Sequence, residues 1–366
     1  MDSMKLEDCC EILDSQRVPI TGSDRTSGDY PYYGANGIQD YVDDFIFDDE
    51  LVLLAEDGGN FGSKTRPIAY RVSGKCWVNN HAHVLKPKAG LDVDYLCYSL
   101  MLYYVGGMVN GATRQKLTQA AMRQMIIPKR SLDEQIEIVN IIKKVQGVIA
   151  SRKEELEQLD LLIKARFVEL FGDININDKN WKYEPLGELC TIVRGGSPRP
   201  IEQFLGGDVP WIKIGDATDG DSIYLNSTKE HIIQEGIKKS RLVKEGSLIF
   251  ANCGVSLGFA RIITFDGCIH DGWLAMEDID ERLDKVFLLQ ALNQMTEHFR
   301  AIAPAGTQPN LNTAIMKAYK QVIPPIELQR EFINFAKQVT KSKVAVQKAL
   351  DETQILFDSL MQEYFG

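Results

Sequence analysis

Residues 135–172 read QIEIVNIIKKVQGVIASRKEELEQLDLLIKARFVELFG, and this stretch decides the fold. Its apolar side chains recur at alternating steps of three and four residues from Ile138 to Leu170, which is the spacing of one seam along an α-helix. The same spacing returns from Phe332 to Tyr364, 194 residues later. The sequence therefore predicts two long helices, each with a single apolar seam.

Both predicted helices carry boundary signals. Pro128 and the capping box Ser131–Glu134 precede the first helix, Gly172 suits its left-handed end, and Pro324–Pro325 precede the second. A seam on an isolated helix would face water, so we expect the two seams to pack against each other as an antiparallel coiled coil. The residues predicted to form the seam and a partner interface are Ile138, Ile142, Val145, Ile149, Leu156, Leu159, Ile163, Phe332, Val339, Val346, Leu350, Phe357 and Leu360.

The regions before the two helices also repeat each other. The matching segments are Leu6–Ile12 with Leu186–Ile192 at an offset of 180, Gly59 with Gly254 at 195, and Thr113–Leu117 with Thr307–Leu311 at 194. Short apolar runs between Gly, Asn and Asp turns predict strands and a few helices, one of them over Val93–Val105. The predicted order is a globular domain at 1–127, a helix at 128–172, a second globular domain at 173–323 and a helix at 324–366.

These patterns predict an α+β fold class. Two similar α/β domains are separated by two long antiparallel helices packed as a coiled coil, with an internal pseudo-twofold repeat. The length of 366 residues and the 44% hydrophobic content suit two domains with cores of their own. The net charge of −10 argues against a protein that coats nucleic acid through bulk positive charge, but it leaves room for local basic patches.

Cysteine usage and hydropathy indicate the compartment. Seven cysteines occur without a Cys-x-x-Cys pair, which favours reduced and mostly buried thiols. The amino terminus has neither a basic start nor an apolar run, and no stretch approaches the roughly 18 apolar residues of a membrane span. We therefore expect a soluble, cytoplasmic protein with no membrane partner.

Common catalytic signatures are missing from the sequence. No lysine has an acidic residue two positions before it, as in P-D…(D/E)-x-K nucleases, and the only Pro-Pro pair lies outside the tetrad of amino-methyltransferases. No G-x-S-x-G or H-E-x-x-H motif occurs. His81 and His83 lack a metal-like spacing to Cys or acidic residues, so a structural or polar-contact role is favoured over metal binding. No catalytic residue, metal ligand or cofactor of this chain's own is predicted.

The loop Gly58–Thr65 misses the P-loop pattern only by Ser63 in place of the second Gly. A P-loop opens a helix, whereas the β-like run Ile68–Val72 follows here, so nucleotide binding is disfavoured. Two interpretations stay open: a solvated turn, or a loop that meets a DNA backbone and base edges. In the second half, Arg and Lys in glycine-bracketed loops suit phosphate and guanine, while Asn and Gln suit adenine. The candidate DNA-contacting residues are Asn60, Lys64, Thr65, Arg66, Arg114, Arg194, Ser197, Arg199, Lys213, Asn252 and Gln308.

The ordered double set of motifs resembles the DNA-specificity subunit of type I restriction-modification enzymes over essentially the whole chain. Each half opens with a Leu-…-Cys-…-Ile segment and has a strand followed by a Gly loop. The halves close with Gly-Ala-Thr-Arg-Gln-Lys-Leu117 and Gly-Thr-Gln-Pro-Asn-Leu311, each followed by Ile-Pro and a helix ending in Phe-Gly. The second copy departs from the pattern at Leu328–Arg330, where the first has Glu134 and Gln135.

The resemblance implies that the globular parts are target-recognition domains, each reading one half of a split site in double-stranded DNA, with the helices setting the unread gap. It also implies that two methylation subunits bind along the helices and bring S-adenosylmethionine and the catalytic residues, and that an ATP-driven restriction subunit can join them. Because the two domains differ in their loops, the full site should be non-palindromic. An alternative of another class is a two-headed protein-assembly adaptor without DNA binding, which the acidic composition favours. A stand-alone modification enzyme would need catalytic residues that the motifs do not supply.

Overall fold

The structure is a computed structural model that describes residues 2–63, 65–111, 115–218, 223–254, 256–304 and 310–366. The chain divides into two compact units, residues 1–153 with 348–366 and residues 154–347. Each unit thus holds one globular domain, part of one long helix and part of the other. No helix among the described residues is long and apolar enough to cross a lipid bilayer.

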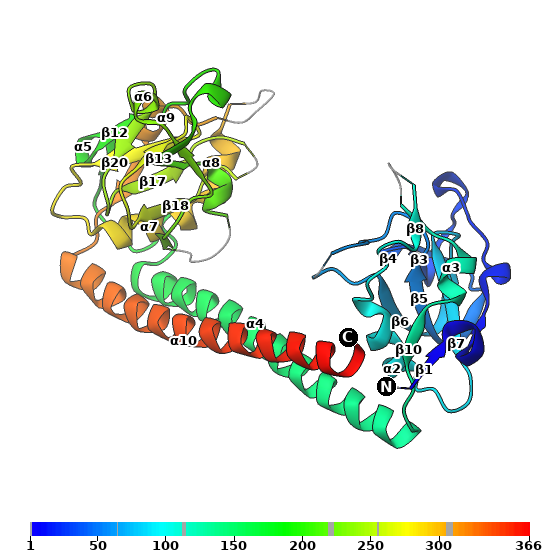
Figure 1. Ribbon diagram of the computed structural model, residues 1–366. Helices are drawn as coiled ribbons and strands as arrows, with labels where there is room; N and C mark the ends of the chain where they lie inside the picture. Colours follow the sequence, from blue (N-terminus) through cyan, green and yellow to red (C-terminus); the bar gives the residue numbers. More distant parts are fainter. Residues whose placement is uncertain (1, 64, 112–114, 219–222, 255, 305–309) are drawn as a thin grey trace. The chain divides into compact units, whose positions relative to one another are not determined.

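A six-stranded sheet forms the centre of the first domain (Figure 1). Neighbouring strands are antiparallel, except that β3 and β6 are parallel. In spatial order the strands are β2 (Cys10–Ile12), β7 (Ala82–Pro87), β5 (Phe47–Ala55), β6 (Ala69–Val78), β3 (Ser27–Gly34) and β4 (Gly37–Val42). The central β5 is buried continuously from Leu51 to Ala55, the pattern of a strand that is covered on both faces.

Helix α2 (Val93–Met101) packs against β5 and β6. It ends four residues before the predicted Val105, so that boundary was wrong. The Met101 carbonyl accepts a hydrogen bond from the backbone N–H of Ile68 at 2.9 Å instead of continuing the helix. The remaining elements of this domain are α1 (Leu6–Cys9), α3 (Gln119–Arg123), the pair β1 (Ser3–Lys5) with β10 (Ile126–Pro128), the pair β8 (Val109–Asn110) with β9 (Lys116–Leu117), and 3-10 turns at Asp14–Gln16 and Gly22–Asp24.

The second domain contains a five-stranded and a four-stranded sheet. The first sheet has the order β12 (Thr191–Arg194), β20 (Trp273–Glu277), β17 (Leu248–Ala251), β18 (Ala260–Ile263) and β14 (Tyr224–Leu225). The second has the order β15 (Glu230–Ile232), β13 (Leu205–Ile212), β19 (Gly267–Ile269) and β16 (Arg241–Val243). The other elements are the pair β11 (Tyr183–Pro185) with β21 (Lys320–Val322), α5 (Leu186–Leu189), α6 (Gln234–Ile237), α7 (Lys285–Gln294), α8 (Thr296–Ile302), α9 (Thr313–Ala318), and 3-10 turns at Ile201–Gln203 and Ile214–Asp216.

The two domains share a four-stranded antiparallel frame. Its order β12-β20-β17-β18 repeats β2-β7-β5-β6, and α7 packs on β18 as α2 packs on β6. Comparing the two frames corrects one of the sequence matches, that of Gly59 with Gly254. Gly254 corresponds to Gly58 rather than to Gly59, because both follow a residue in an isolated bridge to the closing segment and both have positive φ, +62° and +74°. The fold class and the internal repeat are confirmed.

The long helices are α4 (Leu132–Phe171) and α10 (Ile326–Phe365). The predicted capping box is present, since the Ser131 N–H donates to Glu134 Oε2 at 2.8 Å and the Glu134 N–H donates to Ser131 Oγ at 3.4 Å. Gly172 has the left-handed φ of +76° that a helix end favours. Both helices are therefore formed over almost the full extent of the periodic pattern.

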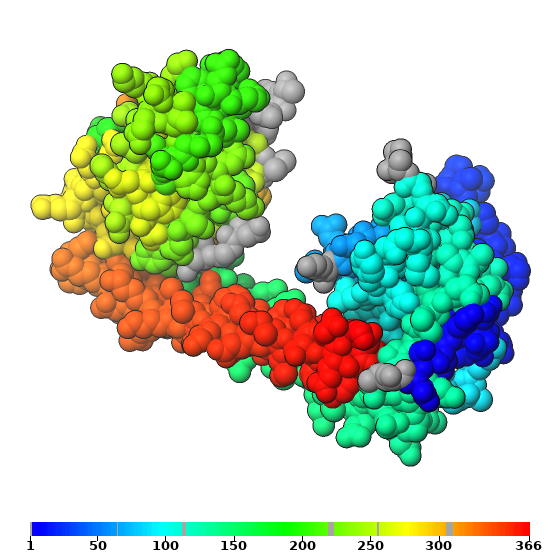
Figure 2. All heavy atoms as spheres, viewed as in Figure 1, coloured from blue at the N-terminus to red at the C-terminus, as the bar shows by residue number. Residues whose placement is uncertain are grey.

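Contacts within each unit show that the helices run antiparallel (Figure 1). In the second unit Arg166 pairs with Glu331 at 2.6 Å and Asp160 with Lys343 at 2.7 Å, so rising numbers in α4 meet falling numbers in α10. In the first unit the end of α10, red in Figure 2, lies against the globular domain. The Phe365 ring is 5.2 Å from that of Tyr95.

The predicted seam lies on the inner side of the helices. Its buried residues are Ile138, Ile142, Ile149, Ile163, Phe332, Val339, Val346, Leu350 and Phe357, and its half-buried residues are Val145, Leu156, Leu159 and Leu360. Four of these residues are only half-buried, and the use of the seam as a partner interface stays a prediction. Near its end the seam of α4 passes onto Phe167 and Phe171, which pack against Phe287 of α7. The helix thereby joins the core of the second domain.

Candidate nucleic-acid interface

Three predicted residues of the second domain meet at one turn, the connection between β19 and β20. Arg194 Nε donates to the backbone carbonyl of Asp271 at 3.0 Å, and Ser197 Oγ donates to its carboxylate at 2.8 Å. Arg199 lies 4.0 Å from the other carboxylate oxygen, and its side chain is 72% exposed. A Cβ at Gly195 would lie 2.1 Å from the His270 carbonyl, so this loop needs glycine to approach the turn.

Lys213 directly follows β13 and lies near the same turn. Its ammonium pairs with Glu230 and lies 5.8 Å from the ring centre of Trp211, which neighbours His270 at 5.7 Å. Burial lowers the pKa of His270, the charge of Asp271 opposes this, and the nearby cations Arg199, Lys213 and Arg194 lower it further. The structure thus brings Arg194, Ser197, Arg199 and Lys213 together around a largely neutral imidazole.

The predicted loop of the first domain is a compact turn. Asn60 Nδ2 donates to the Pro67 carbonyl at 3.2 Å, and Ser63 Oγ accepts from the backbone N–H groups of Thr65 and Arg66 at 3.3 and 2.9 Å. Thr65 and Arg66 are exposed, and strand β6 follows instead of the helix that a P-loop opens, as the β-like run Ile68–Val72 predicted. The candidates Lys64, Arg114 and Gln308 lie outside the described residues.

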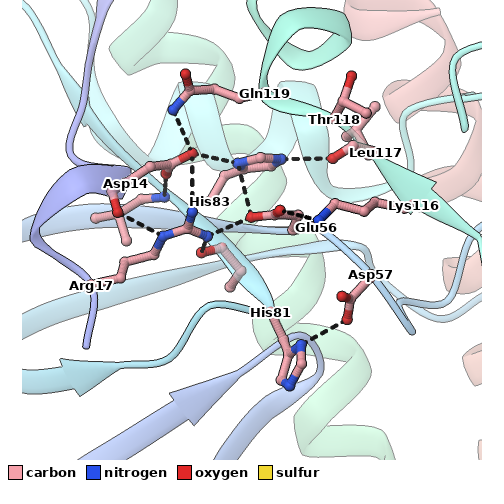
Figure 3. A network of polar contacts seen from close by, with 12 residues as sticks. Asp14, Arg17, Glu56, Asp57, His81, His83, Lys116, Leu117, Thr118 and Gln119 are labelled. Carbon is pink, nitrogen blue, oxygen red and sulfur yellow. Dashed lines mark hydrogen bonds and ion pairs between the residues drawn. The ribbon is translucent and has the colours of Figure 1, made fainter. Parts of the chain in front are cut away.

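A buried polar network in the first domain was missed by the sequence analysis (Figure 3). The imidazole of His83 lies 2.7 Å from Asp14 Oδ2 and 3.7 Å from Glu56 Oε2. Arg17 Nη1 donates to Glu56 Oε2 at 2.6 Å, and Gln119 Nε2 donates to Asp14 Oδ2 at 2.9 Å. These residues come from four separate segments, so no local pattern could have predicted the whole network.

The network has the donor set of a metal site but already contains a cation. One ligand atom each from Asp14, Glu56 and His83 lie within 4.8 Å of one another. The guanidinium of Arg17 stands between the two carboxylates, 3.5 Å from Asp14 and 2.6 Å from Glu56. Arg17 thus supplies the positive charge that a metal would bring. His81 likewise pairs with an acid, Asp57, at 2.8 Å, which agrees with a polar-contact role for both histidines.

The charges of the network stabilise one another. The second ring nitrogen of His83 lies 2.9 Å from the Leu117 carbonyl, so both ring nitrogens face hydrogen-bond acceptors. Burial raises the pKa of Asp14, but the hydrogen bond and charge of His83, together with hydrogen bonds from the Val84 backbone and Gln119, leave the pKa lowered. Burial also opposes the shift at Glu56, whose pKa is lowered by hydrogen bonds from Arg17 and Lys116.

Asn252 of the second domain occupies the position of Glu56. The backbone carbonyls of both accept from the N–H of the matching leucine, at 2.7 Å for Leu117 to Glu56 and 2.8 Å for Leu311 to Asn252. The Asn252 side chain is fully buried, and its amide nitrogen donates to the Leu311 carbonyl at 3.2 Å. Because this side chain does not reach the surface of the domain, its burial speaks against the predicted contact of Asn252 with a base.

The repeated frame and the paired helices define a class of proteins in which two similar domains are each followed by a long helix. The profile of the type I restriction modification DNA specificity domain family matches residues 1–161 and 178–353. A type I restriction enzyme specificity subunit of Haemophilus influenzae is 30% identical over 90% of this chain and 85% of that protein. The MjaIX specificity subunit of Methanocaldococcus jannaschii is 22% identical over 81% of this chain and 74% of that protein.

Solved structures have the same fold. The S subunit of a type I restriction-modification system from M. genitalium aligns with a TM-score of 0.57 at 15% identity, covering 100% of this chain and 96% of that one. A chain from a structure on complex assembly and conformational transition of the type I R-M system aligns with a TM-score of 0.60 at 16% identity, covering 100% and 97%. The chain belongs to the type I restriction modification DNA specificity domain family.

Proposed function

We propose that each domain of this chain reads one half of a gapped site in double-stranded DNA, and that the two helices set the unread spacing. The observation that carries the proposal is a shared backbone frame with different polar side chains on it. His83 lies opposite Leu54 in the first domain, and Leu274 takes that place opposite Phe250 in the second. Glu56 and Asn252 differ in the same way. These residues are buried beneath the surface, and supports that differ in this way suit two different half-sites, and hence a non-palindromic site.

The cluster of Arg194, Ser197, Arg199 and Lys213 around Asp271 is the proposed DNA-facing part of the second domain. Its cations have acidic neighbours, as in the pairs Arg199–Asp271 and Lys213–Glu230. With a net charge of −10, such a chain attracts phosphate weakly by itself. The broad positive surface would come from its partners. Family membership gives no support to the alternative of a protein adaptor that does not bind DNA.

The chain itself is proposed to be non-catalytic and cytoplasmic. Methylation would be the work of two partner subunits that bring S-adenosylmethionine, and ATP-driven cleavage that of a restriction subunit. Two apolar pairs support a partner surface on the helices: Leu161 with Leu162 on α4, and Ile355 with Leu356 on α10. They occupy equivalent positions 194 residues apart and are exposed by 53%, 46%, 69% and 50%. Equivalent surfaces suit two copies of one partner.

An exchange of one domain tests the proposal. Residues 1–127 are replaced by the corresponding domain of the Haemophilus relative, and the complex with the methylation subunit selects sites from a random double-stranded DNA library. We expect one half of the selected site to change while the other half and the spacing stay the same. A simultaneous change of both halves would contradict the assignment of one half-site to each domain.

Salt dependence is the control for DNA contact. If the complex neutralises phosphates, the logarithm of its affinity falls linearly with the logarithm of the salt concentration, by about 0.9 for each phosphate. A complex whose selection is unaffected by salt and sequence would contradict DNA reading altogether.

A further inference from the structure

The residue before the closing leucine of each domain occupies the same place in the frame. Lys116 forms an antiparallel bridge with Asp57, and Asn310 forms one with Cys253. The next residues, Leu117 and Leu311, are both fully buried. Lys116 and Asn310 therefore stand at matching surface positions, each beside the glycine loop that follows the central strand.

In the first domain, Lys116 forms an ion pair with a carboxylate of the buried network. Its ammonium lies 2.9 Å from Glu56 Oε1, while the other oxygen of Glu56 accepts from Arg17. The Lys116 side chain is 50% exposed, whereas that of Glu56 is only 11% exposed. A buried carboxylate thus fixes the end of a lysine at the surface of the domain (Figure 3).

In the second domain, the same position is held by a neutral pair. Asn252 Nδ2 donates to Asn310 Oδ1 at 3.4 Å, and the Asn310 side chain is half-buried. A charged donor supported by a carboxylate in one domain is thus replaced by an amide supported by an amide in the other. The two equivalent positions therefore differ both in the charge of the side chain and in the groups that it offers for hydrogen bonding.

We propose that Lys116 and Asn310 are the matched specificity-determining residues of the two domains, with Glu56 and Asn252 as their positioning residues. The proposal rests on the proposed function. Lys116 donates to the acceptors O6 and N7 of guanine in its half-site, and Asn310 pairs with the acceptor and donor of adenine in the other. Because Glu56 balances the charge of Lys116, this lysine serves as a directed hydrogen-bond donor rather than as a phosphate anchor.

Exchanging the two chemistries tests this assignment. The variants are Lys116→Asn alone, Lys116→Asn with Glu56→Asn, and Asn310→Lys with Asn252→Glu, each purified with the methylation subunit and offered the random DNA library. We expect Lys116→Asn to reduce the preference for guanine at one base pair of one half-site by about tenfold or more. We expect the Asn310 variant to change one base pair of the other half-site.

The controls distinguish a change in base preference from a loss of folding. Lys86→Asn is the matched control, because Lys86 also pairs with a carboxylate, Asp49, at 2.7 Å and is similarly exposed, at 38%. It lies toward the other end of β7 from the network. The half-site read by the unaltered domain reports that the variant complex is folded. A wild-type complex that selects no gapped site would overturn the proposed function itself.

Two outcomes would overturn the inference while leaving DNA reading intact. One is an unchanged half-site in the Lys116→Asn complex. The other is a uniform loss of affinity for all sequences with a salt slope lowered by about 1, which is the behaviour of a phosphate contact.

Discussion

One buried glutamine fastens each long helix to the domain from which it emerges. Gln135 accepts from the Asp92 N–H at 2.8 Å and donates to the carbonyls of Gly90 and Arg130, both at 3.0 Å. Gln329 does the same with the Asp284 N–H at 2.8 Å and the carbonyls of Arg282 and Pro324, at 2.9 and 2.8 Å. Both glutamines are fully buried. The repeat thus extends to single hydrogen bonds, and it fixes the orientation of each helix at its origin.

Replacing Gln135 by leucine should destabilise the first domain. Three backbone groups would lose their partner in a buried place, which costs about 2–4 kcal/mol in the free energy of unfolding. Hydrogen exchange of the core amides in β5 measures the loss. Gln146→Leu is the control, because Gln146 on the same helix accepts from Tyr98 at 2.6 Å and only about 1 kcal/mol should be lost. Equal losses of stability in the two variants would argue against the role of Gln135 in fastening helix α4 to the domain.

At the scale of elements, the sequence predicted what is local. Helices α4 and α10 could be predicted because each pattern of threes and fours lies within one stretch, and the capping box spans only Ser131–Glu134. The end of α2 could not, because the backbone N–H of Ile68, just before strand β6 and distant in the sequence, donates to the Met101 carbonyl. The repeat predicted that the domains are alike.

The candidate site was harder to predict. Residue type and glycine-bracketed loops found Arg194, Ser197, Arg199 and Lys213, which the fold brings together. The same reasoning chose Asn252, whose side chain is buried, and it did not choose Lys116 and Asn310, the two residues that we propose from the structure. Whether an amide faces solvent depends on strand pairings between segments that are dozens of residues apart, and a single sequence does not contain that information.

The exposed apolar pairs on the helices should each dock one methylation subunit. Changing Leu161 and Leu162 to serine removes apolar area from one pair and leaves its equivalent, Ile355 with Leu356, unchanged. Native mass spectrometry of the complex should then show one methylation subunit in place of two. Changing all four residues should leave none.

A single exposed valine serves as the control for this experiment. Val344 is 63% exposed on α10, but its equivalent on α4 is Ala150, so it is not part of a repeated pair. Val344→Ser should keep both methylation subunits. If altering either pair releases both copies at once, the two surfaces are not independent docking sites.

At the scale of the whole molecule, duplication explains how one chain can read two different sequences. Each half supplies a domain and a helix, and each helix begins at one domain and ends on an aromatic residue of the other. Phe171 of α4 packs against Phe287, and Phe365 of α10 packs against Tyr95. The side chains that carry chemistry have meanwhile diverged on a constant frame, as Glu56 and Asn252 show. The two domains thereby carry the sequence specificity, and the two helices set the spacing between the half-sites.

Lengthening both helices together should lengthen the unread spacer. Two heptads that continue the seam are inserted after Lys153 in α4 and after Gln347 in α10, equivalent positions where the two compact units join. At about 1.5 Å per residue, fourteen residues add about 21 Å, which corresponds to roughly 6 base pairs of DNA. Site selection from the random library should return the same two half-sites with a longer gap. The insertion in α4 alone is the control, because it leaves the two seams unequal and should lower stability rather than reset the gap. A double insertion that keeps the original spacing would show that the helices do not measure it.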